Sequence, residues 1–143
     1  LADLVERIDE LLATTPTAFD RNRPRLFVDR VFAARGSGTV VTGTLTDGSF
    51  AVGQSVVIQP EGMEARIRSM QSHGQGVDTI PPGSQVALNL AGVEHQTLRR
   101  GSVIVRPGHW HLTREFDAHL TMVPTIDHPV TSRGAWSLHL GSD

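Results

Sequence analysis

The glycine-rich stretch of this chain, from Arg35 to Gly43 (RGSGTVVTG), has residue types that could bind a phosphate group. A nucleotide-binding phosphate loop needs a lysine directly after its later glycine, and this stretch has none. A dinucleotide-binding loop needs a third glycine at a fixed spacing and a helix after it, and neither is present. The pattern instead predicts a tight hairpin whose glycines permit positive φ, with a plain turn as the alternative interpretation.

Histidines are the second group that could do chemistry. Two histidines at i and i+2 of a strand can share a face, as His109 and His111 would around Trp110. No H-x₃-H pair and no suitably spaced acidic residue accompanies them, which favours solvated or hydrogen-bonded histidines over a zinc site. The other downstream histidines are His119, His128 and His139.

Catalytic chemistry finds no support elsewhere in the sequence. Cysteine is absent, which excludes disulfides, thiolate metal sites and cysteine nucleophiles. Ser37 has no histidine near it in the sequence, and no Ser-His-Asp arrangement is readable. We therefore predict no catalytic residue and no metal site, so that the chain by itself is not an enzyme.

The charge balance limits the partners of the protein. The net charge is −2 and the pI is about 6.4, which does not suit a protein that coats itself in nucleic acid. All thirteen basic residues are arginines, whose planar side chains suit phosphates and carboxylates, although a genomic composition bias would explain the missing lysines equally well. No apolar run is long enough to span a bilayer. We predict a cytoplasmic protein with no membrane or DNA partner and with local RNA contacts only.

The elements that must position any site begin with a helix. Leucine and isoleucine side chains recur at helical spacing over residues 1–13, and Pro16 ends the pattern. We assign 1–16 to this helical segment and the polar, turn-rich residues 17–24 to a linker. A lone helix of this length is unstable in water, so it must pack on the barrel or on another domain.

From residue 25 the pattern is typical of an all-β protein. Short alternating segments separated by glycine- and proline-rich turns indicate a barrel or a sandwich. Residues 25–107 are enough to close a six-stranded barrel, which is the fold we predict. The predicted strands are 25–34, 39–45, 55–59, 65–70, 85–90 and 102–105. The side chains predicted to be largely buried are Val28, Val31, Val41, Val57, Ile67, Val86 and Leu88.

Residues 108–143 are expected to start a further β domain. Side chains alternate over 116–122, and residues 135–140 read as another strand. Two or three strands cannot bury a barrel core alone, so we interpret 108–143 as the first part of a truncated second barrel. Its strands are expected to pair onto the first barrel or onto a neighbouring molecule.

Several motifs of residues 24–107 resemble the second domain of elongation factor Tu and related translational GTPases. That family has a hairpin like the one over Val28–Phe32, then a G-x-G-T-V-V-T-G loop like Gly36–Gly43, then a glycine turn like Asp47–Gln54. The segments Gly83–Leu90 and Arg100–Val103 continue the similarity. The resemblance implies a translation-factor barrel that binds the end of an aminoacyl-tRNA.

Within this family, the sequence is most similar to the selenocysteine-specific factors. The carrying segments are Val28–Phe32 (VDRVF), Ala87–Gly92 (ALNLAG) and Leu138–Ser142 (LHLGS). The resemblance implies that residues 1–16 are the last helix of a missing GTPase domain, which would hold GTP and Mg²⁺. No cofactor is then expected in this chain.

The function implied by the resemblance is binding of the 3′ end of selenocysteyl-tRNA during its GTP-dependent delivery to the ribosome. The implied partners are selenocysteyl-tRNA, the GTPase domain of the same protein and the ribosome. One alternative is the equivalent barrel of another translational GTPase, of the elongation factor Tu or initiation factor gamma type. Another is a spacer barrel without a ligand.

The resemblance also implies which residues would contact the tRNA end. The pocket for the terminal adenosine would lie between the Ala34–Val40 hairpin and the Gln71–His73 strand end. The residues that would line or support it are Ala34, Gly36, Val40, Gln71 and Leu88. The amino acid would lie near Asp29 and Arg30, joined by Gln85 at a position that is basic in the family. Adjacent strand residues point to opposite faces, so only Arg30 is expected to face the ligand unless a bulge intervenes.

Overall fold

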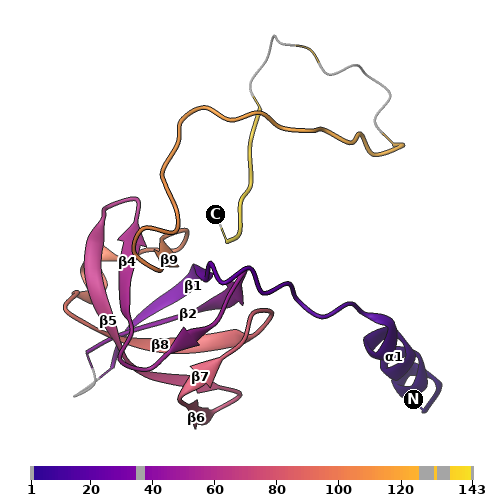
Figure 1. Ribbon diagram of the computed structural model, residues 1–143. Coiled ribbons are helices and arrows are strands. Elements are labelled where there is room, and N and C mark those ends of the chain that lie inside the picture. Colours follow the sequence, from indigo (N-terminus) through magenta and orange to yellow (C-terminus); the bar gives the residue numbers. More distant parts are fainter. Residues whose placement is uncertain (1, 35–37, 126–130, 132–135, 143) are drawn as a thin grey trace.

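The computed structural model describes residues 2–34, 38–125, 131 and 136–142, and it consists of one α-helix followed by a β-barrel (Figure 1). None of the described helices is long and apolar enough to cross a membrane. In chain order the elements are α1 (Ala2–Thr14), β1 (Arg25–Ala34), β2 (Gly38–Thr46), β3 (Phe50–Ala51), β4 (Ser55–Gln59), β5 (Met63–Ser72), β6 (Gln75–Val77), β7 (Thr79–Ile80), β8 (Gln85–Ala91), the 3₁₀-helix η1 (His95–Thr97) and β9 (Val103–Val105).

Six antiparallel strands close on themselves to form the barrel. Their order is β4-β9-β1-β2-β8-β5, and β5 pairs again with β4 to complete the ring. The short β6 extends the pairing of β5, and β3 and β7 form a separate two-stranded sheet. This closure confirms the predicted six-stranded barrel, and it leaves the ring without the free edges of an open sheet.

Alternate residues of the strands fill the interior of the barrel. Along β8, the buried Val86, Leu88 and Leu90 alternate with residues that are at least partly exposed, because successive side chains of a strand point to opposite faces. Five of the seven predicted core residues are buried. These five are Val28, Val41, Ile67, Val86 and Leu88.

The other two predicted core residues, Val31 and Val57, are only partly buried. In β4 the buried side chains are those of Val56 and Ile58, so the prediction that Val57 is largely buried was wrong by one residue. A one-residue error exchanges the two faces of a strand, and the uniformly apolar run of β4 gives no alternation from which to choose. Val31 follows an irregularity in β1 and packs at the margin of the core.

That irregularity is a β-bulge at Asp29. Val28 pairs with Gly43 and Arg30 pairs with Thr42, which leaves Asp29 as an extra residue opposite no partner. Gly43 has to be glycine because a Cβ there would overlap the backbone carbonyl group of Phe27. The bulge interrupts the alternation of β1. Odd-numbered residues point outward before it, and even-numbered residues point outward after it.

A buried carboxylate fastens the linker to the barrel. Asp47 follows β2 and binds the guanidinium groups of Arg21 and Arg25 at 2.8 and 2.9 Å. Its backbone oxygen also accepts hydrogen bonds from the amides of Arg21 and Arg23. Burial raises the pKa of Asp47, but the adjacent Thr46 hydroxyl and the two arginine charges outweigh burial and hold this pKa below its usual value.

The segment that leaves the barrel meets the linker at the same place. Trp110 donates a hydrogen bond from Nε1 to the backbone oxygen of Arg23 at 3.1 Å. The guanidinium carbons of Arg23 and Arg25 lie 4.6 and 4.2 Å from the centre of the Trp110 ring, within the range of cation–π attraction. Arg23 also donates to the backbone oxygen of His109. The chain therefore begins and ends the barrel at neighbouring points.

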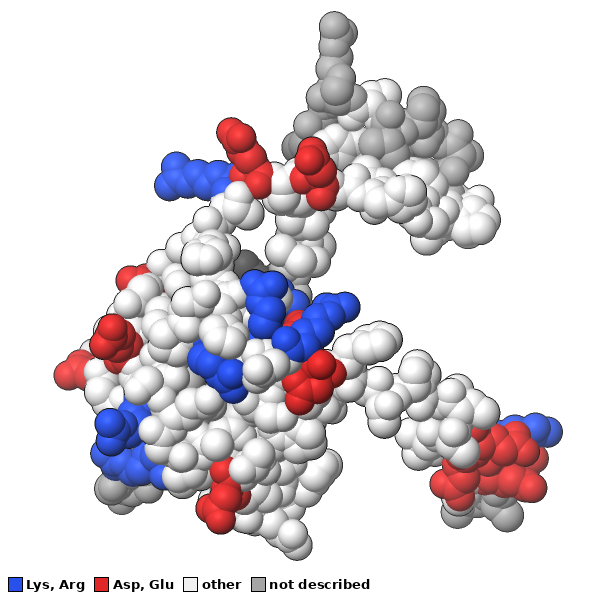
Figure 2. Space-filling view, in the orientation of Figure 1, with Lys and Arg blue, Asp and Glu red and all other residues white. Residues whose placement is uncertain are grey.

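The helix α1 projects away from the barrel (Figure 1). Its apolar residues, including Leu4, Leu11 and Leu12, remain exposed. The expected alternative in which this helix packs on the barrel is therefore not observed. Figure 2 shows acidic side chains gathered on the helix, whereas basic side chains cluster on the barrel near the base of the linker.

The two segments expected as strands, 116–122 and 135–140, form no strand in their described residues, which leave out residue 135. The described residues after Val105, namely 106–125, 131 and 136–142, form no strand, and their large apolar side chains such as Leu112, Phe116 and Leu120 are exposed. A strand needs a partner for its backbone groups, and the closed ring offers no free edge to pair with. The expectation that these strands would pair onto the barrel was wrong for that reason.

Candidate functional site

The outer face of four neighbouring strands carries most of the side chains predicted for a site. The register of β1, β2, β8 and β5 places Arg30 beside Thr42, Thr42 beside Ala87 and Ala87 beside Gln71. The inward side chains of the same strands fill the core, so this row lies on the outside of the barrel. A row of outward side chains that crosses four strands provides a surface on which a ligand could lie.

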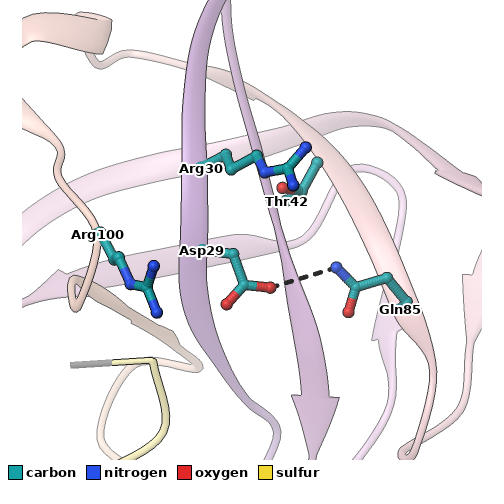
Figure 3. Close-up of a pocket in the computed structure, with 5 residues that line it drawn as sticks. All are labelled: Asp29, Arg30, Thr42, Gln85 and Arg100. Atoms are coloured by element: carbon teal, nitrogen blue, oxygen red, sulfur yellow. Dashed lines mark hydrogen bonds between the residues drawn. The ribbon is translucent and has the colours of Figure 1, made fainter.

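An open cavity of about 490 Å³ lies at one end of this row. It is lined by Asp29, Arg30, Thr42, Gln85 and Arg100 (Figure 3). Three of these residues were predicted as site residues from the sequence, and the fold brings them together although β1 and β8 are far apart along the chain. The lining is entirely polar or charged, which favours a polar or ionic ligand over an apolar one.

The bulge explains why two adjacent residues of β1 reach the same cavity. In a regular strand Asp29 and Arg30 would point to opposite faces. Because Asp29 is the extra residue of the bulge, both side chains turn away from the core and line the cavity. The expectation that Arg30 alone faces the site applied to an unbulged strand and is replaced by this arrangement.

Gln85 orients the carboxylate of Asp29. The Gln85 amide donates a hydrogen bond from Nε2 to Oδ2 of Asp29 at 3.3 Å, and its Oε1 accepts one from the Thr44 hydroxyl at 2.8 Å. Since both ends of the amide are engaged, its orientation is fixed. Gln85 therefore positions a charged group of the cavity and contributes no charge itself.

The charges of the cavity favour an anion. Arg30 and Arg100 contribute two positive charges and Asp29 one negative charge, so the lining carries a net charge of about +1. Within the described residues, the Arg30 guanidinium makes no hydrogen bond or ion pair. Its charge is therefore left to the solvent or to a ligand.

Two lining residues were missed by the sequence analysis. Arg100 lies in the turn before β9, in the Arg100–Val103 segment that was used only to support the resemblance. Thr42 lies in the glycine-rich stretch and is brought next to Arg30 by the register of β1 and β2. An arginine and a threonine are both residue types that can bind a polar ligand. Because the two residues are separated from Asp29 along the chain, the sequence did not show that they lie near it.

The residues predicted to contact an adenosine are divided between the two faces. Val40 and Gln71 lie on the outer face, whereas Leu88 is fully buried and points into the core. The outward neighbour of Leu88 is Asn89, which pairs with Val40. In the described part of the chain the side-chain oxygen of Asn89 is buried without a hydrogen-bond partner.

Ala34, a further predicted residue, is the last residue of β1. The backbone of Ala34 pairs with that of Gly38. Gly36 lies outside the described residues. For the histidines, the described residues contain no group of three or more His, Cys, Asp or Glu side chains that could hold a metal ion.

The segment Gly141–Ser142 borders the cavity from outside the barrel. The Ser142 hydroxyl donates to the backbone oxygen of Val28 at 2.7 Å, and Arg100 donates from Nε to the backbone oxygen of Ser142 at 2.6 Å. A second, smaller cavity of about 230 Å³ between this segment and β1 and β2 shares Asp29 with the first.

Comparisons with known proteins agree with this architecture. The family model described as elongation factor Tu domain 2 matches residues 38–105. The selenocysteine-specific elongation factor of Desulfomicrobium baculatum is 34% identical over 142 residues, which is 99% of this chain and 22% of the relative. Elongation factor 1-alpha of Metallosphaera sedula is 27% identical over 90% of this chain and 26% of the relative. The chain thus spans about a quarter or less of the length of these relatives.

Solved structures give the same result. A crystal structure of a bacterial selenocysteine-specific elongation factor, EF-Sec, matches 74% of this chain and 18% of its own with a TM-score of 0.69 and 36% identity. The apo form of translation elongation factor SelB from Methanococcus maripaludis matches 73% of this chain and 22% of its own, with a TM-score of 0.69 and 27% identity.

Proposed function

Because the barrel of this chain is a second domain of the elongation factor Tu family, of the selenocysteine-specific type, we propose that it binds the aminoacylated 3′ end of selenocysteyl-tRNA. The observation that carries the proposal is the cavity lined by Asp29, Arg30 and Gln85 on the outer face of the barrel. These are the residues that the family resemblance assigns to the amino acid. Their convergence depends on a bulge and on pairing between distant strands.

The amino acid and the adenosine occupy adjacent parts of this outer face. The amino acid side chain enters the cavity between Asp29 and Arg30. The adenosine lies on the neighbouring part of this outer face, against Gln71 of the row and Val40 beside it, toward Ala34 at the end of β1. Leu88 supports this surface from the core, and Asn89 is the residue of β8 that reaches it.

The chemistry of the side chain accounts for selectivity. A selenol is more acidic than a thiol, so at neutral pH the bound residue is a selenolate, whereas the serine hydroxyl stays neutral. Arg30 gains Coulomb energy from the anion that it does not gain from the hydroxyl, and partial desolvation in the cavity enlarges the difference. A charge-assisted contact is worth about 1.5–3 kcal/mol, or roughly ten- to a hundredfold in affinity.

The rest of the function belongs to the parent protein. In this proposal α1 is the last helix of a GTPase domain that holds GTP and Mg²⁺, and residues 108–143 begin a third β domain. The exposed apolar side chains of α1 would pack within that GTPase domain. The parent protein would deliver selenocysteyl-tRNA to the ribosome in the cytoplasm.

The experiment measures the affinity of the complete, GTP-bound factor for selenocysteyl-tRNA and for seryl-tRNA, with the same tRNA species in both. The wild-type factor is compared with its Arg30→Ala variant. The expected result is a loss of roughly ten- to a hundredfold for the selenocysteyl form, with little change for the seryl form. Arg114→Ala, which removes an exposed arginine that does not line the cavity, is the matched control. Equal losses for both tRNAs would remove Arg30 from the selection of selenocysteine.

The elongation factor 1-alpha relatives support a second candidate, a barrel that accepts many aminoacyl-tRNAs. The same measurement separates the two candidates. A general factor would bind the seryl and selenocysteyl forms with similar affinity, and Arg30→Ala would not change their ratio.

A further inference from the structure

Arg100 approaches the cavity from a different part of the chain than the other charged residues. Asp29 and Arg30 belong to β1, whereas Arg100 lies in the turn between η1 and β9. In Figure 3 the guanidinium groups of Arg30 and Arg100 lie on either side of the Asp29 carboxylate. The cavity therefore has two cations separated by one anion.

The backbone around Arg100 is fixed to β1 beside the bulge. The amide of Gly101 donates to the backbone oxygen of Val28 at 3.0 Å, and the amide of Val28 donates to the backbone oxygen of Ser102 at 2.9 Å. Ser102 is fully buried. These bonds hold the backbone that follows Arg100 against Val28, the residue before Asp29, so the side chain of Arg100 remains to be positioned.

The side chain of Arg100 is positioned by the segment after the barrel. Its Nε donates to the backbone oxygen of Ser142 at 2.6 Å. A guanidinium has five N–H donors, and this bond uses one, which leaves the four on Nη1 and Nη2 for another ligand. Those two nitrogens lie on the side of Arg100 that faces Asp29 in Figure 3.

The segment itself fits closely against β1. A Cβ at Gly141 would overlap the ring of Phe27, and the backbone of Gly141 has φ +63°, which glycine adopts readily. The Ser142 hydroxyl adds a hydrogen bond of 2.7 Å to the backbone oxygen of Val28. The position of the Ser142 oxygen, and with it that of Arg100, thus depends on the absence of a side chain at residue 141.

We propose that Arg100 is a specificity-determining residue that supplies the second cation for the selenolate, and that Gly141 and Ser142 set its position. The inference rests on the proposed function and deepens it. Gln85 is neutral and its amide is already engaged by Asp29 and Thr44, so β8 supplies no charge. Arg100 supplies that charge from the opposite side of Asp29.

A selenolate suits this arrangement better than the other monoanion of a tRNA end, a backbone phosphate. A single charged atom can contact one arginine within the electric field of the other, with the uncharged part of the residue toward the Asp29 carboxylate. A phosphate presents several charged oxygens, and some of them would face Asp29. The two anions also predict different dependence on the amino acid, which the experiment uses.

The first experiment measures binding of selenocysteyl-, seryl- and uncharged tRNA to the complete factor and to its Arg100→Ala variant. Loss of about tenfold or more for selenocysteyl-tRNA alone is expected. Equal loss for all three tRNAs would assign Arg100 to a phosphate, and no loss would remove it from the site; either result overturns the inference. If the wild-type factor prefers neither aminoacylated form to uncharged tRNA, the proposed function itself fails.

The second experiment tests positioning with Gly141→Ala. The added methyl group displaces the segment from Phe27 and releases Arg100, so a selective loss in the same direction as that of Arg100→Ala is expected. The double variant Phe27→Ala, Gly141→Ala makes room for the methyl group and should restore most of the selectivity. Unchanged selectivity in Gly141→Ala, with an unchanged thermal midpoint, would show that the segment does not position Arg100.

Discussion

Gln85 donates a hydrogen bond to Asp29 at 3.3 Å, although 56 positions of sequence separate the two residues. The contact joins β8 to the bulge of β1 across β2. It fixes the carboxylate that separates the two arginines of the cavity. A neutral amide at this position therefore serves to hold an anion, and replacing the amide by a cation should change the charge of the cavity directly.

We expect Gln85→Arg to restore selectivity to the Arg100→Ala variant. The new guanidinium can pair with Asp29 and adds back the positive charge that was removed. Selenocysteyl-tRNA binding by the double variant should recover by several-fold over Arg100→Ala alone. Gln85→Met, which has a similar length and no charge, is the control and should not recover binding. If both Gln85→Arg and Gln85→Met restored selenocysteyl-tRNA binding to Arg100→Ala, the added positive charge would not be the cause of the recovery.

Asp47→Asn should destabilise the barrel by about 1–3 kcal/mol. Asparagine tolerates the positive φ of 61° at this position, so the effect reports the lost charge rather than backbone strain. Most of the lost stability should come from the ion pair with Arg25, whose side chain is 30% exposed. The side chain of Arg21 is 65% exposed, so its ion pair with Asp47 is screened by solvent. Urea unfolding measures the change. Asp78→Asn, at an exposed position, should leave stability within about 0.5 kcal/mol.

The lowered pKa of Asp47 predicts acid sensitivity. Its pKa in the folded state lies below the ordinary value of 3.8, so the ionised group stabilises the fold above that value. This stabilisation is lost as the pH falls through the folded-state pKa. The difference in unfolding free energy between wild type and Asp47→Asn should be constant near neutrality and shrink below about pH 4. A difference that grows on acidification would contradict this assignment.

Gly43→Ala should destabilise the barrel by about 1–3 kcal/mol, because the new methyl group meets the Phe27 carbonyl group across the β1–β2 pair. Gly76→Ala is the matched control. Gly76 also lies in a strand, has no positive φ, and has open space where the methyl group would be. Thermal unfolding of the two variants should differ accordingly. Equal thermal unfolding midpoints for the two variants would indicate that the backbone of β1 moves to make room for the methyl group at little cost in stability.

Periodicity was sufficient to predict the barrel and most of its core. Alternation identified Val28 and Leu88 as buried residues. It failed in β4, where two consecutive valines do not show which of them is buried, and Val57 was predicted in place of Val56. The site could be predicted only in part. Asp29, Arg30 and Gln85 converge as the resemblance implied, whereas the bulge that turns both β1 residues outward has no clear signature in the sequence.

The long-range contacts of Arg100 could not be predicted. Nothing in the local sequence of Arg100 indicates that it reaches the cavity, because its position depends on bonds to Val28 and Ser142. The resemblance gives Leu88 as lining or supporting the adenosine surface, and its buried side chain can act only as support from the core. The alternation along β8 places Asn89 on that surface instead.

The contact between Arg23 and Trp110 has an evolutionary consequence. Because the chain enters and leaves the barrel at neighbouring points, residues 24–109 form a unit whose two ends lie close together. A unit with adjacent ends can be inserted into a different host protein without stretching the host backbone. Transplanting residues 24–109 between factors, with Arg23 and Trp110 marking the places to cut, should therefore give a folded barrel, whereas transfer of the amino acid preference should also require the Gly141–Ser142 segment that positions Arg100.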